Sequence, residues 1–133
     1  QKHYGLAEDY EMTADEETKM HEEFGTTMIT DFPELTSPFW NMSRNADGKT
    51  AKKIDVILGG METIGSAERS CDVDMMRDTF HSITDGAYSK LLYSLFSKER
   101  VEAELEKFLE FDFFPRVGGG IGMTRMIAAL EKH

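Results

Sequence analysis

The sequence predicts an α+β fold, in which part of an antiparallel β-sheet is flanked by helices. Its strand-like segments precede a run of helical segments instead of alternating with them. Two strand-like segments are separated only by the pair Gly59-Gly60, and a glycine cluster over 118–122 leads into a last helix-forming segment. Alternating strands and helices are typical of a parallel sheet, whereas strands joined by a tight turn pair as an antiparallel hairpin.

Length and composition indicate one folded domain. A chain of 133 residues buries roughly two-thirds of its unfolded surface, and the 40% hydrophobic content excludes a disordered chain. No apolar run approaches the roughly 20 residues of a membrane helix. The net charge of −10 repels phosphate backbones and argues against broad, non-specific nucleic-acid binding, so that any nucleic-acid contact is expected to be local. Cys71 is the single cysteine and no signal peptide opens the chain, which fits a cytoplasmic protein or an excised segment of one.

A helix near residues 14–24 is the first predicted element, and a strand follows it. Thr13 and Asp15 are residue types that cap helix N-termini. Glutamates and the apolar Met20 and Phe24 then follow at helical spacing until Gly25 ends the pattern. Residues 26–32 are rich in β-branched and aromatic side chains, which favour a strand.

A loop and a second short strand are predicted next. Pro33 and Pro38 bracket the loop, and residues 39–42 read as the strand. Trp40 within it is expected in the core, with the wall of a binding pocket as the alternative. Asparagine, aspartate and glycine over 45–48 then mark a turn.

The centre of the chain predicts a β-hairpin. Residues 53–58 alternate and are apolar enough for a central strand, and Gly59-Gly60 breaks that strand. Residues 61–66 can return beside it as the antiparallel neighbour.

Three helices are predicted after the hairpin. Apolar residues recur three or four positions apart over 73–83 and again over 88–96. Ser97 can cap a third helix, whose apolar residues lie over 101–109 and which ends before Pro115.

The glycine cluster over 118–122 predicts a strand-to-helix transition and a phosphate site. Glycines before a helix let main-chain N–H groups approach an anion, and the helix over 123–130 presents its N-terminus to it. Arg125, one turn into that helix, can hold a phosphate with two hydrogen bonds. The spacing matches neither a P-loop nor a dinucleotide fingerprint. A close strand–helix crossing that needs glycine explains the cluster equally well.

Three charged residues of the predicted hairpin form a second candidate cluster. Asp55 lies in the first strand between apolar residues, and in a suitable register Glu62 joins it on one face. Two carboxylates so placed can share a Mg²⁺ that also contacts nucleotide phosphates. Arg69, at the other end of the second strand, can pair with a small carboxylate or amide substrate. The alternative is a strand-edge acid, a solvated glutamate and a surface arginine.

Several short stretches, taken in order along the chain, match the motifs of one known family. They are Glu22-Glu23-Phe24-Gly25, Thr30-Asp31-Phe32-Pro33, Pro38-Phe39-Trp40-Asn41-Met42, Ile54-Asp55-Val56-Ile57-Leu58, Gly60-Met61-Glu62, Ala67-Glu68-Arg69 and Gly118-Gly119-Gly120-Ile121-Gly122-Met123-Thr124-Arg125. Together they resemble the C-terminal half of the catalytic core of class II aminoacyl-tRNA synthetases, subclass b, near the asparaginyl and aspartyl enzymes. The last stretch resembles motif 3, which occupies 118–130 here.

The resemblance implies an ATP-dependent ligase. In the implied reaction, the carboxylate of Asn or Asp attacks the α-phosphate of ATP and displaces pyrophosphate, which gives an aminoacyl-adenylate. The aminoacyl group is then transferred to tRNA, and AMP leaves. ATP and Mg²⁺ are the implied cofactors. Carried onto matching positions, the resemblance assigns Asp55 and Glu62 to the metal, Glu62, Gly120, Gly122 and Arg125 to ATP, Arg69 and Gly118 to the amino acid, and Arg125 to catalysis.

Departures from the family pattern leave the activity open. Motif 1, the dimer interface, and motif 2 have no counterpart, so residues 1–133 are expected to be the C-terminal part of a catalytic domain, inactive alone. The full-length protein is expected to be a homodimer that contacts tRNA mostly outside this segment. Glu68 replaces the usual glutamine, and Gly118-Gly119-Gly120 lacks the usual His-Ser or His-Ala. Both changes resemble the synthetase-derived asparagine synthetases, which use ammonia as acceptor. A non-catalytic paralogue that binds an amino acid or a nucleotide is the third interpretation.

Overall fold

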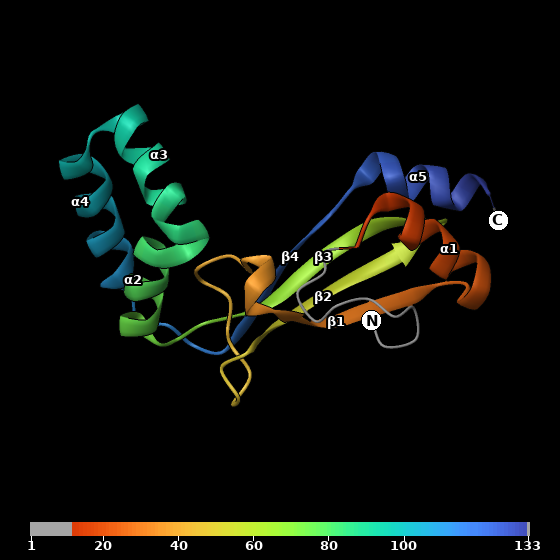
Figure 1. Cartoon of the computed structure of the whole chain (residues 1–133), viewed down its shortest axis with the longest axis horizontal. Coiled ribbons are helices and arrows are strands. Elements are labelled where there is room, and N and C mark those ends of the chain that lie inside the picture. The colour runs from red at the N-terminus through yellow and green to blue at the C-terminus, as the bar shows by residue number, and fades with distance from the viewer. Residues whose placement is uncertain (1–11, 133) are drawn as a thin grey trace.

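The computed structural model describes residues 12–132, and a four-stranded antiparallel sheet in the order β1-β2-β3-β4 forms its centre. The strands are β1 (Thr27–Pro33), β2 (Thr50–Leu58), β3 (Met61–Arg69) and β4 (Arg116–Ile121). Helices α1 (Ala14–Phe24) and α5 (Met123–Glu131) lie at one end of the sheet, and the other three helices lie at its opposite end (Figure 1). The predicted α+β fold is therefore confirmed, and so is the passage of the glycine cluster from a strand into a helix.

The β2–β3 hairpin forms as predicted and extends further than the predicted strands. Gly59 and Gly60 close it with φ values of +59° and +83°, a region that residues with side chains rarely adopt. A Cβ atom at Gly59 would lie 3.3 Å from Ala129 of α5, and one at Gly60 would lie 3.5 Å from Thr18 of α1. The glycine pair therefore makes the turn and also lets both helices pack closely against it.

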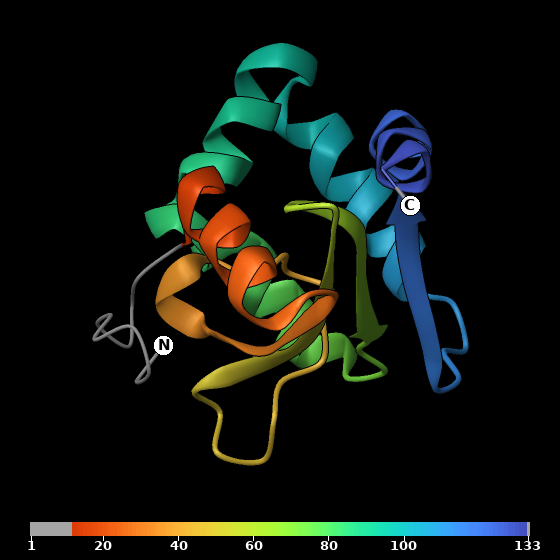
Figure 2. The same ribbon diagram turned by 90° about the vertical axis from the view of Figure 1, so that its right-hand side faces the viewer.

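The sheet bends around α1. Figure 2 shows β1 and β2 passing below this helix while β3 and β4 stand to its right, and α1 contacts the first three strands. The Thr13 main-chain N–H donates to Glu16 Oε2 at 2.8 Å, so the predicted cap begins the helix. Met20 is the buried residue of α1. Among the described helices, none combines the length and the apolar character needed to cross a lipid bilayer.

The strand predicted over 39–42 does not form. Residues 40 and 41 make a turn, and only Met42 pairs with a strand, in an isolated bridge to Arg69. The β-type composition of this stretch was misleading because Trp40 packs into a helical core instead of along a sheet. The Trp40 ring lies 5.4 Å from that of Phe80, centroid to centroid, in an edge-to-face contact.

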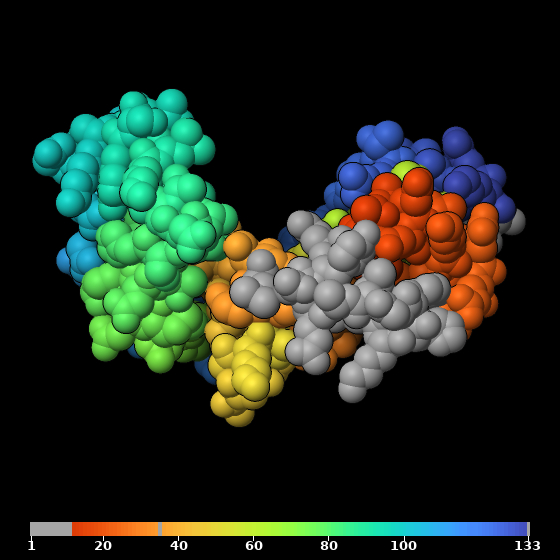
Figure 3. All heavy atoms as spheres, in the orientation of Figure 1, coloured from red at the N-terminus to blue at the C-terminus, as the bar shows by residue number. Residues whose placement is uncertain are grey.

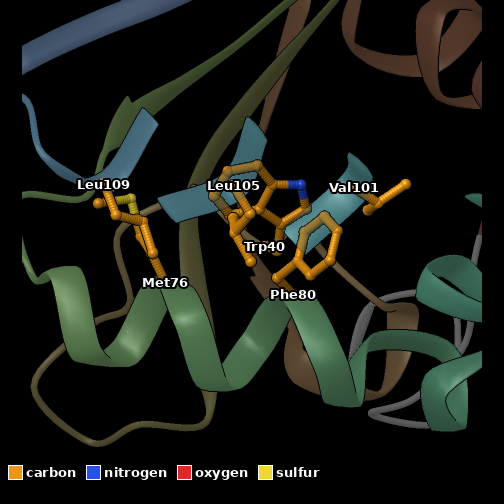
Figure 4. Packing of buried hydrophobic residues seen from close by; sticks show 6 residues of the cluster. All are labelled: Trp40, Met76, Phe80, Val101, Leu105 and Leu109. Carbon is orange, nitrogen blue, oxygen red and sulfur yellow. The ribbon is translucent and has the colours of Figure 1, made fainter. Parts of the chain in front are cut away.

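The three helices that follow the hairpin enclose this core. They are α2 (Val73–Ser82), α3 (Ala87–Phe96) and α4 (Lys98–Leu109), with a short 3₁₀ turn (Ile83–Gly86) between the first two. Figure 4 shows the buried cluster, in which Trp40 lies between one side of α2 and one side of α4. Its members are Trp40, Met76, Phe80, Val101, Leu105 and Leu109. The predicted apolar spacing therefore identifies the buried sides of α2 and α4. The structure also confirms the prediction that Trp40 is a core residue.

An ion pair between His81 and Glu102 joins α2 to α4. His81 Nε2 lies 3.0 Å from Glu102 Oε1, and Nδ1 lies 2.8 Å from the main-chain oxygen of Arg77. Burial lowers the pKa of His81, but the hydrogen bonds to Glu102 and Arg77 outweigh it and raise the pKa above 6.5. The Tyr93 hydroxyl and His81 hydrogen-bond to Glu102 and hold its pKa below 4.5.

We expect this pair to make stability depend on pH in both directions. The raised pKa of His81 gives a contribution that is complete below pH 6.5 and is lost as pH rises through the folded value. The lowered pKa of Glu102 gives one that is complete above pH 4.5 and is lost as pH falls through the folded value. In His81→Gln, the free energy of unfolding should therefore no longer decrease as pH rises through the folded pKa of His81. Urea unfolding at a series of pH values above and below 6.5 measures this. The effect should stay below about 1 kcal/mol because the pair is partly exposed. An unchanged alkaline limb in this variant would contradict the assignment.

Candidate functional site

The candidate site lies on one face of the sheet, along a row of residues that crosses all four strands. The strand register places Ile29, Asp55, Gly65 and Gly120 side by side, one from each strand. Facing residues of neighbouring strands project to the same side of a sheet, so Asp55 shares its face with two glycines. Asp55 itself is only 5% exposed. The glycines leave bare main chain beside a buried carboxylate.

A β-bulge brings Glu62 onto the same face. After Val56 the register shifts, so that Ile57 pairs with Glu62 and Thr63 is left as the extra residue. Without the bulge Ile57 would face Thr63, and Glu62 would project to the side opposite Asp55, because side chains alternate along a strand. Asp55 and Glu62 therefore share a face of the sheet only because of this β-bulge in the hairpin.

The two carboxylates converge over Gly65. A Cβ atom at this glycine would lie 2.8 Å from Glu62 Oε1 and 3.3 Å from Asp55 Oδ1. Lys53 Nζ lies 2.5 Å from Asp55 Oδ2, whereas Asp55 Oδ1 is buried and has no hydrogen-bond partner among the described residues. Burial raises the pKa of Asp55, Lys53 opposes the rise, and the charges of Glu62 and Glu17 add to it. A cation or a proton is therefore favoured between the two carboxylates.

The oxygens present fit a divalent cation that takes its remaining ligands from elsewhere. Mg²⁺ prefers hard oxygen ligands and commonly keeps waters and phosphate oxygens beside one or two carboxylates. Within residues 12–132, no three His, Cys, Asp or Glu side chains are grouped so that they could enclose a metal ion. The unpartnered Asp55 oxygen and the Glu62 carboxylate thus suit a cation shared with another molecule.

Arg125 reaches the end of the sheet that holds Glu62 from the first turn of α5. Its Nη1 atom donates to the main-chain oxygen of Glu62 at 2.7 Å, and the Gly122 N–H donates to the Thr63 oxygen at 2.8 Å. A cavity of about 240 Å³ here is lined by Glu62, Gly120, Gly122 and Arg125, among others. The guanidinium and the glycine-rich main chain thus lie beside one of the two carboxylates.

A larger cavity adjoins the first one. It has a volume of about 580 Å³ and lies between α1, β1 and β2, with Lys53, Asp55 and Glu62 in its lining. Glu62 lines both cavities. In the space-filling view of Figure 3 the molecule is hollowed between the helices of the core and the pair α1 and α5. The site face is therefore open enough to receive a molecule larger than a single ion.

Arg69 and Gly118 lie at the other end of the same face. Arg69 is four residues from Gly65 along β3, which corresponds to about 13 Å of extended strand. Its Nη2 donates to the Gly118 main-chain oxygen at 3.1 Å, and its Nη1 donates to Asn41 Oδ1 at 3.4 Å. A Cβ atom at Gly118 would lie 2.7 Å from Arg69 Nε, so the guanidinium rests on this glycine. The structure thus separates Arg69 from the carboxylates, as the sequence predicted.

Glu68 lies on the opposite face of the sheet. Its carboxylate accepts a hydrogen bond from Lys52 Nζ at 2.9 Å, and both side chains are 42% exposed. Side-chain alternation along β3 separates it from Arg69, its neighbour in the sequence. Glu68, which stands where the resembled family has glutamine, therefore does not contribute a side chain to the face of the candidate site.

Sequence reasoning missed Lys53, Gly65 and Glu17. Lys53 had a usable signal, because it lies two residues from Asp55 in a predicted strand and so shares its face. Gly65 also had one, since a glycine inside a strand often marks a close approach. Glu17 had none: its Oε2 accepts the Glu62 N–H at 3.1 Å across 45 positions of sequence.

Comparison with protein-family models gives one match over the whole chain. The family described as tRNA synthetases class II (D, K and N) matches residues 1–133. No curated protein matches the chain.

Solved structures with a similar fold are asparaginyl- and aspartyl-tRNA synthetases. Asparaginyl-tRNA synthetase from Pyrococcus horikoshii has a TM-score of 0.73 at 20% identity, over 98% of this chain and 30% of its own. The Entamoeba histolytica enzyme in complex with asparaginyl-adenylate has a TM-score of 0.74 at 15% identity, over 98% of this chain and 28% of its own. The Entamoeba histolytica aspartyl-tRNA synthetase has a TM-score of 0.68 at 18% identity, over 93% of this chain and 24% of its own. The chain thus spans less than a third of the length of these structures.

Proposed function

Because this chain belongs to the class II tRNA synthetases of the D, K and N group, we propose that it carries part of the adenylating site of an asparaginyl- or aspartyl-tRNA-synthetase-like ligase. We propose further that it acts within a longer polypeptide that supplies motifs 1 and 2, forms a homodimer and binds tRNA. The matched structures are more than three times as long as the segment they share with this chain, which supports this part of the proposal.

The observation that carries the proposal is the grouping of two carboxylates and a guanidinium at one end of a bare glycine surface. Asp55 and Glu62 would hold a Mg²⁺, which supplies positive charge to the phosphates of ATP. Arg125 would bind the same phosphates, with main-chain N–H groups around Gly120 and Gly122 beside it. These groups are preorganised to offset the charge that develops when a carboxylate attacks the α-phosphorus and pyrophosphate leaves.

The amino acid would lie at the other end of the face, against Arg69. A guanidinium binds a side-chain carboxylate or amide oxygen through directed hydrogen bonds, which suits Asp or Asn. Gly118 keeps this place free of a side chain, and Asn41 holds one edge of the guanidinium. Arg69 therefore selects the substrate in this proposal, while Arg125 serves the nucleotide.

Exchange of pyrophosphate into ATP tests the proposal. The assay uses a polypeptide that contains this segment together with the remainder of its catalytic core, with Asn and with Asp as separate substrates. Exchange that depends on either amino acid supports an adenylating enzyme, and charging of tRNA then identifies a synthetase. Binding of amino acid or nucleotide without any exchange would instead identify a non-catalytic paralogue.

The ammonia-dependent asparagine synthetase is the second candidate within the same chemistry. The Gly118-Gly119-Gly120 stretch still favours it, but Glu68 lies on the opposite face and pairs with Lys52. Formation of free asparagine from Asp, ATP and ammonia, without tRNA charging, would establish this candidate in place of the synthetase.

Two glycine substitutions should separate the nucleotide end from the amino-acid end. A Cβ atom at Gly120 would meet no atom within 4 Å, so Gly120→Ala should fold normally and place its methyl group in the space assigned to ATP. We expect the KM for ATP to rise about tenfold. Gly118→Ala should displace the Arg69 guanidinium and raise the KM for the amino acid by a similar factor. Each variant serves as the control of the other, and equal effects on both substrates would contradict the division of the site.

A further inference from the structure

We propose that Lys53 is a built-in counter-ion that occupies the metal site of this chain and must leave Asp55 before a divalent cation binds. The inference rests on the proposed function, because it concerns the cation assigned there to Asp55 and Glu62. It adds a specificity-determining residue to that site. Its consequence is that the site binds free metal ions only weakly and favours a cation that arrives with a nucleotide.

The position of the Lys53 ammonium group carries this inference. Nζ lies 2.5 Å from Asp55 Oδ2 and 3.8 Å from the centroid of the Phe32 ring. The Lys53 side chain is 25% exposed and that of Asp55 is 7% exposed, so water screens their contact only in part. Two positions apart in β2, they project to the same face. The ammonium group is therefore held on the carboxylate that the cation requires.

Charge explains why the ammonium group lies there. Asp55 and Glu62 converge over Gly65, and Glu17 accepts a hydrogen bond from the Glu62 main chain nearby. Arg125 donates to the Glu62 main-chain oxygen, which leaves Lys53 as the cation seen on the Asp55 carboxylate within the described residues. Like charges crowded in a buried place are unfavourable, and the flexible lysine arm brings a positive charge to them.

A divalent cation and the Lys53 ammonium group compete for the same carboxylate. A cation that contacts Asp55 and Glu62 would lie within a few ångströms of Nζ, and the repulsion between them lowers its affinity. The polyphosphate of a nucleotide brings negative charge that offsets the ammonium group. Lys53 can then turn away from Asp55 on its four-carbon arm and keep the contact that its ammonium group already makes with the Phe32 ring.

Titration of the chain with Mn²⁺, followed by electron paramagnetic resonance, tests the inference without any activity assay. Lys53→Met removes the charge and keeps much of the side-chain volume. We expect it to bind Mn²⁺ at least tenfold more tightly, which is about the effect of one unit charge on a dication at roughly 5 Å even in bulk water. Lys52→Met is the matched control, because Lys52 pairs with Glu68 on the opposite face. It should bind Mn²⁺ like the unaltered chain.

Asp55→Asn distinguishes the failure of this inference from the failure of the proposed function. If Asp55→Asn weakens Mn²⁺ binding while Lys53→Met leaves the affinity unchanged, Lys53 is no competitor and the cation site stands. If Lys53→Met binds no Mn²⁺ although it is folded by circular dichroism, the cation site is absent and both proposals fail.

Amine labelling of the unaltered chain covers the case in which Lys53→Met does not fold. Mg²⁺ at a concentration that saturates the weak site should expose the Lys53 amine and raise its labelling by at least a few-fold, as measured by peptide mass spectrometry, while Lys52 labels equally with and without Mg²⁺. Labelling of Lys53 that Mg²⁺ leaves unchanged would overturn the inference.

Discussion

Replacement of Arg125 by alanine should lower the affinity for ATP about 100-fold, or by roughly 2.7 kcal/mol, because a charge-assisted contact with phosphate is lost from a partly enclosed site. Arg125 lines the cavity that also holds Glu62 and the glycines before α5, so no other side chain of α5 can replace its guanidinium without moving the helix. The measurement is calorimetric titration of ATP into a polypeptide that contains the complete core. Arg125→Lys, which keeps a charge without the fork of donors, should retain part of the affinity.

Loss of a structural hydrogen bond must be separated from loss of a phosphate contact. Arg125→Ala removes the hydrogen bond to the Glu62 main chain, which contributes roughly 1 kcal/mol to folding, so unfolding by urea should be measured beside binding. Arg100→Ala is the control, since Arg100 lies in α4 over the Phe96 ring, among the helices of the core. Undiminished ATP affinity in a folded Arg125→Ala variant would remove the phosphate role of this residue.

Replacement of Trp40 by alanine should destabilise the fold by about 3–5 kcal/mol. The side chain is only 8% exposed and packs edge-to-face against Phe80 and Phe108, so its removal leaves a large cavity between α2 and α4. Since domains of this size are stable by about 5–15 kcal/mol, the variant should lose at least about a fifth of that stability. Urea unfolding followed by far-ultraviolet circular dichroism gives the measurement, because Trp40 is the single tryptophan and its fluorescence is lost with it.

Trp40→Phe and Leu95→Ala set the scale for that loss. The indole N–H of Trp40 is buried and has no acceptor among the described residues, so phenylalanine loses volume but also removes an unsatisfied donor. We expect that variant to lose less than about 1.5 kcal/mol. Leu95 is 62% exposed on α3, and its replacement should change stability by less than about 0.5 kcal/mol. A Trp40→Ala variant as stable as Leu95→Ala would show that the helices do not depend on this core.

Local patterns in the sequence predicted most of the secondary structure correctly. The capping residue Thr13, the turn at Gly59-Gly60 and the apolar spacing of α2 and α4 each rest on interactions within a few residues, which a sequence displays directly. The stretch over 39–42 is the exception: its composition suits a strand, yet Trp40 has its partners in helices about 40 and 68 positions further along. Propensity describes a segment alone and therefore cannot report such a distant contact.

The order of the amino acids supplies the chemical groups of this protein: two acids on a hairpin, a guanidinium after a glycine cluster, and a second guanidinium at the far end of a strand. How these groups meet depends on the folded sheet. The extra residue at Thr63 turns Glu62 toward Asp55, and pairing of β4 with β3 sets Gly120 and Arg125 beside them. One inserted residue reverses the facing of a side chain, and strand pairing joins segments more than 50 positions apart. Both are properties of the register between strands, which depends on the summed packing of the whole sheet.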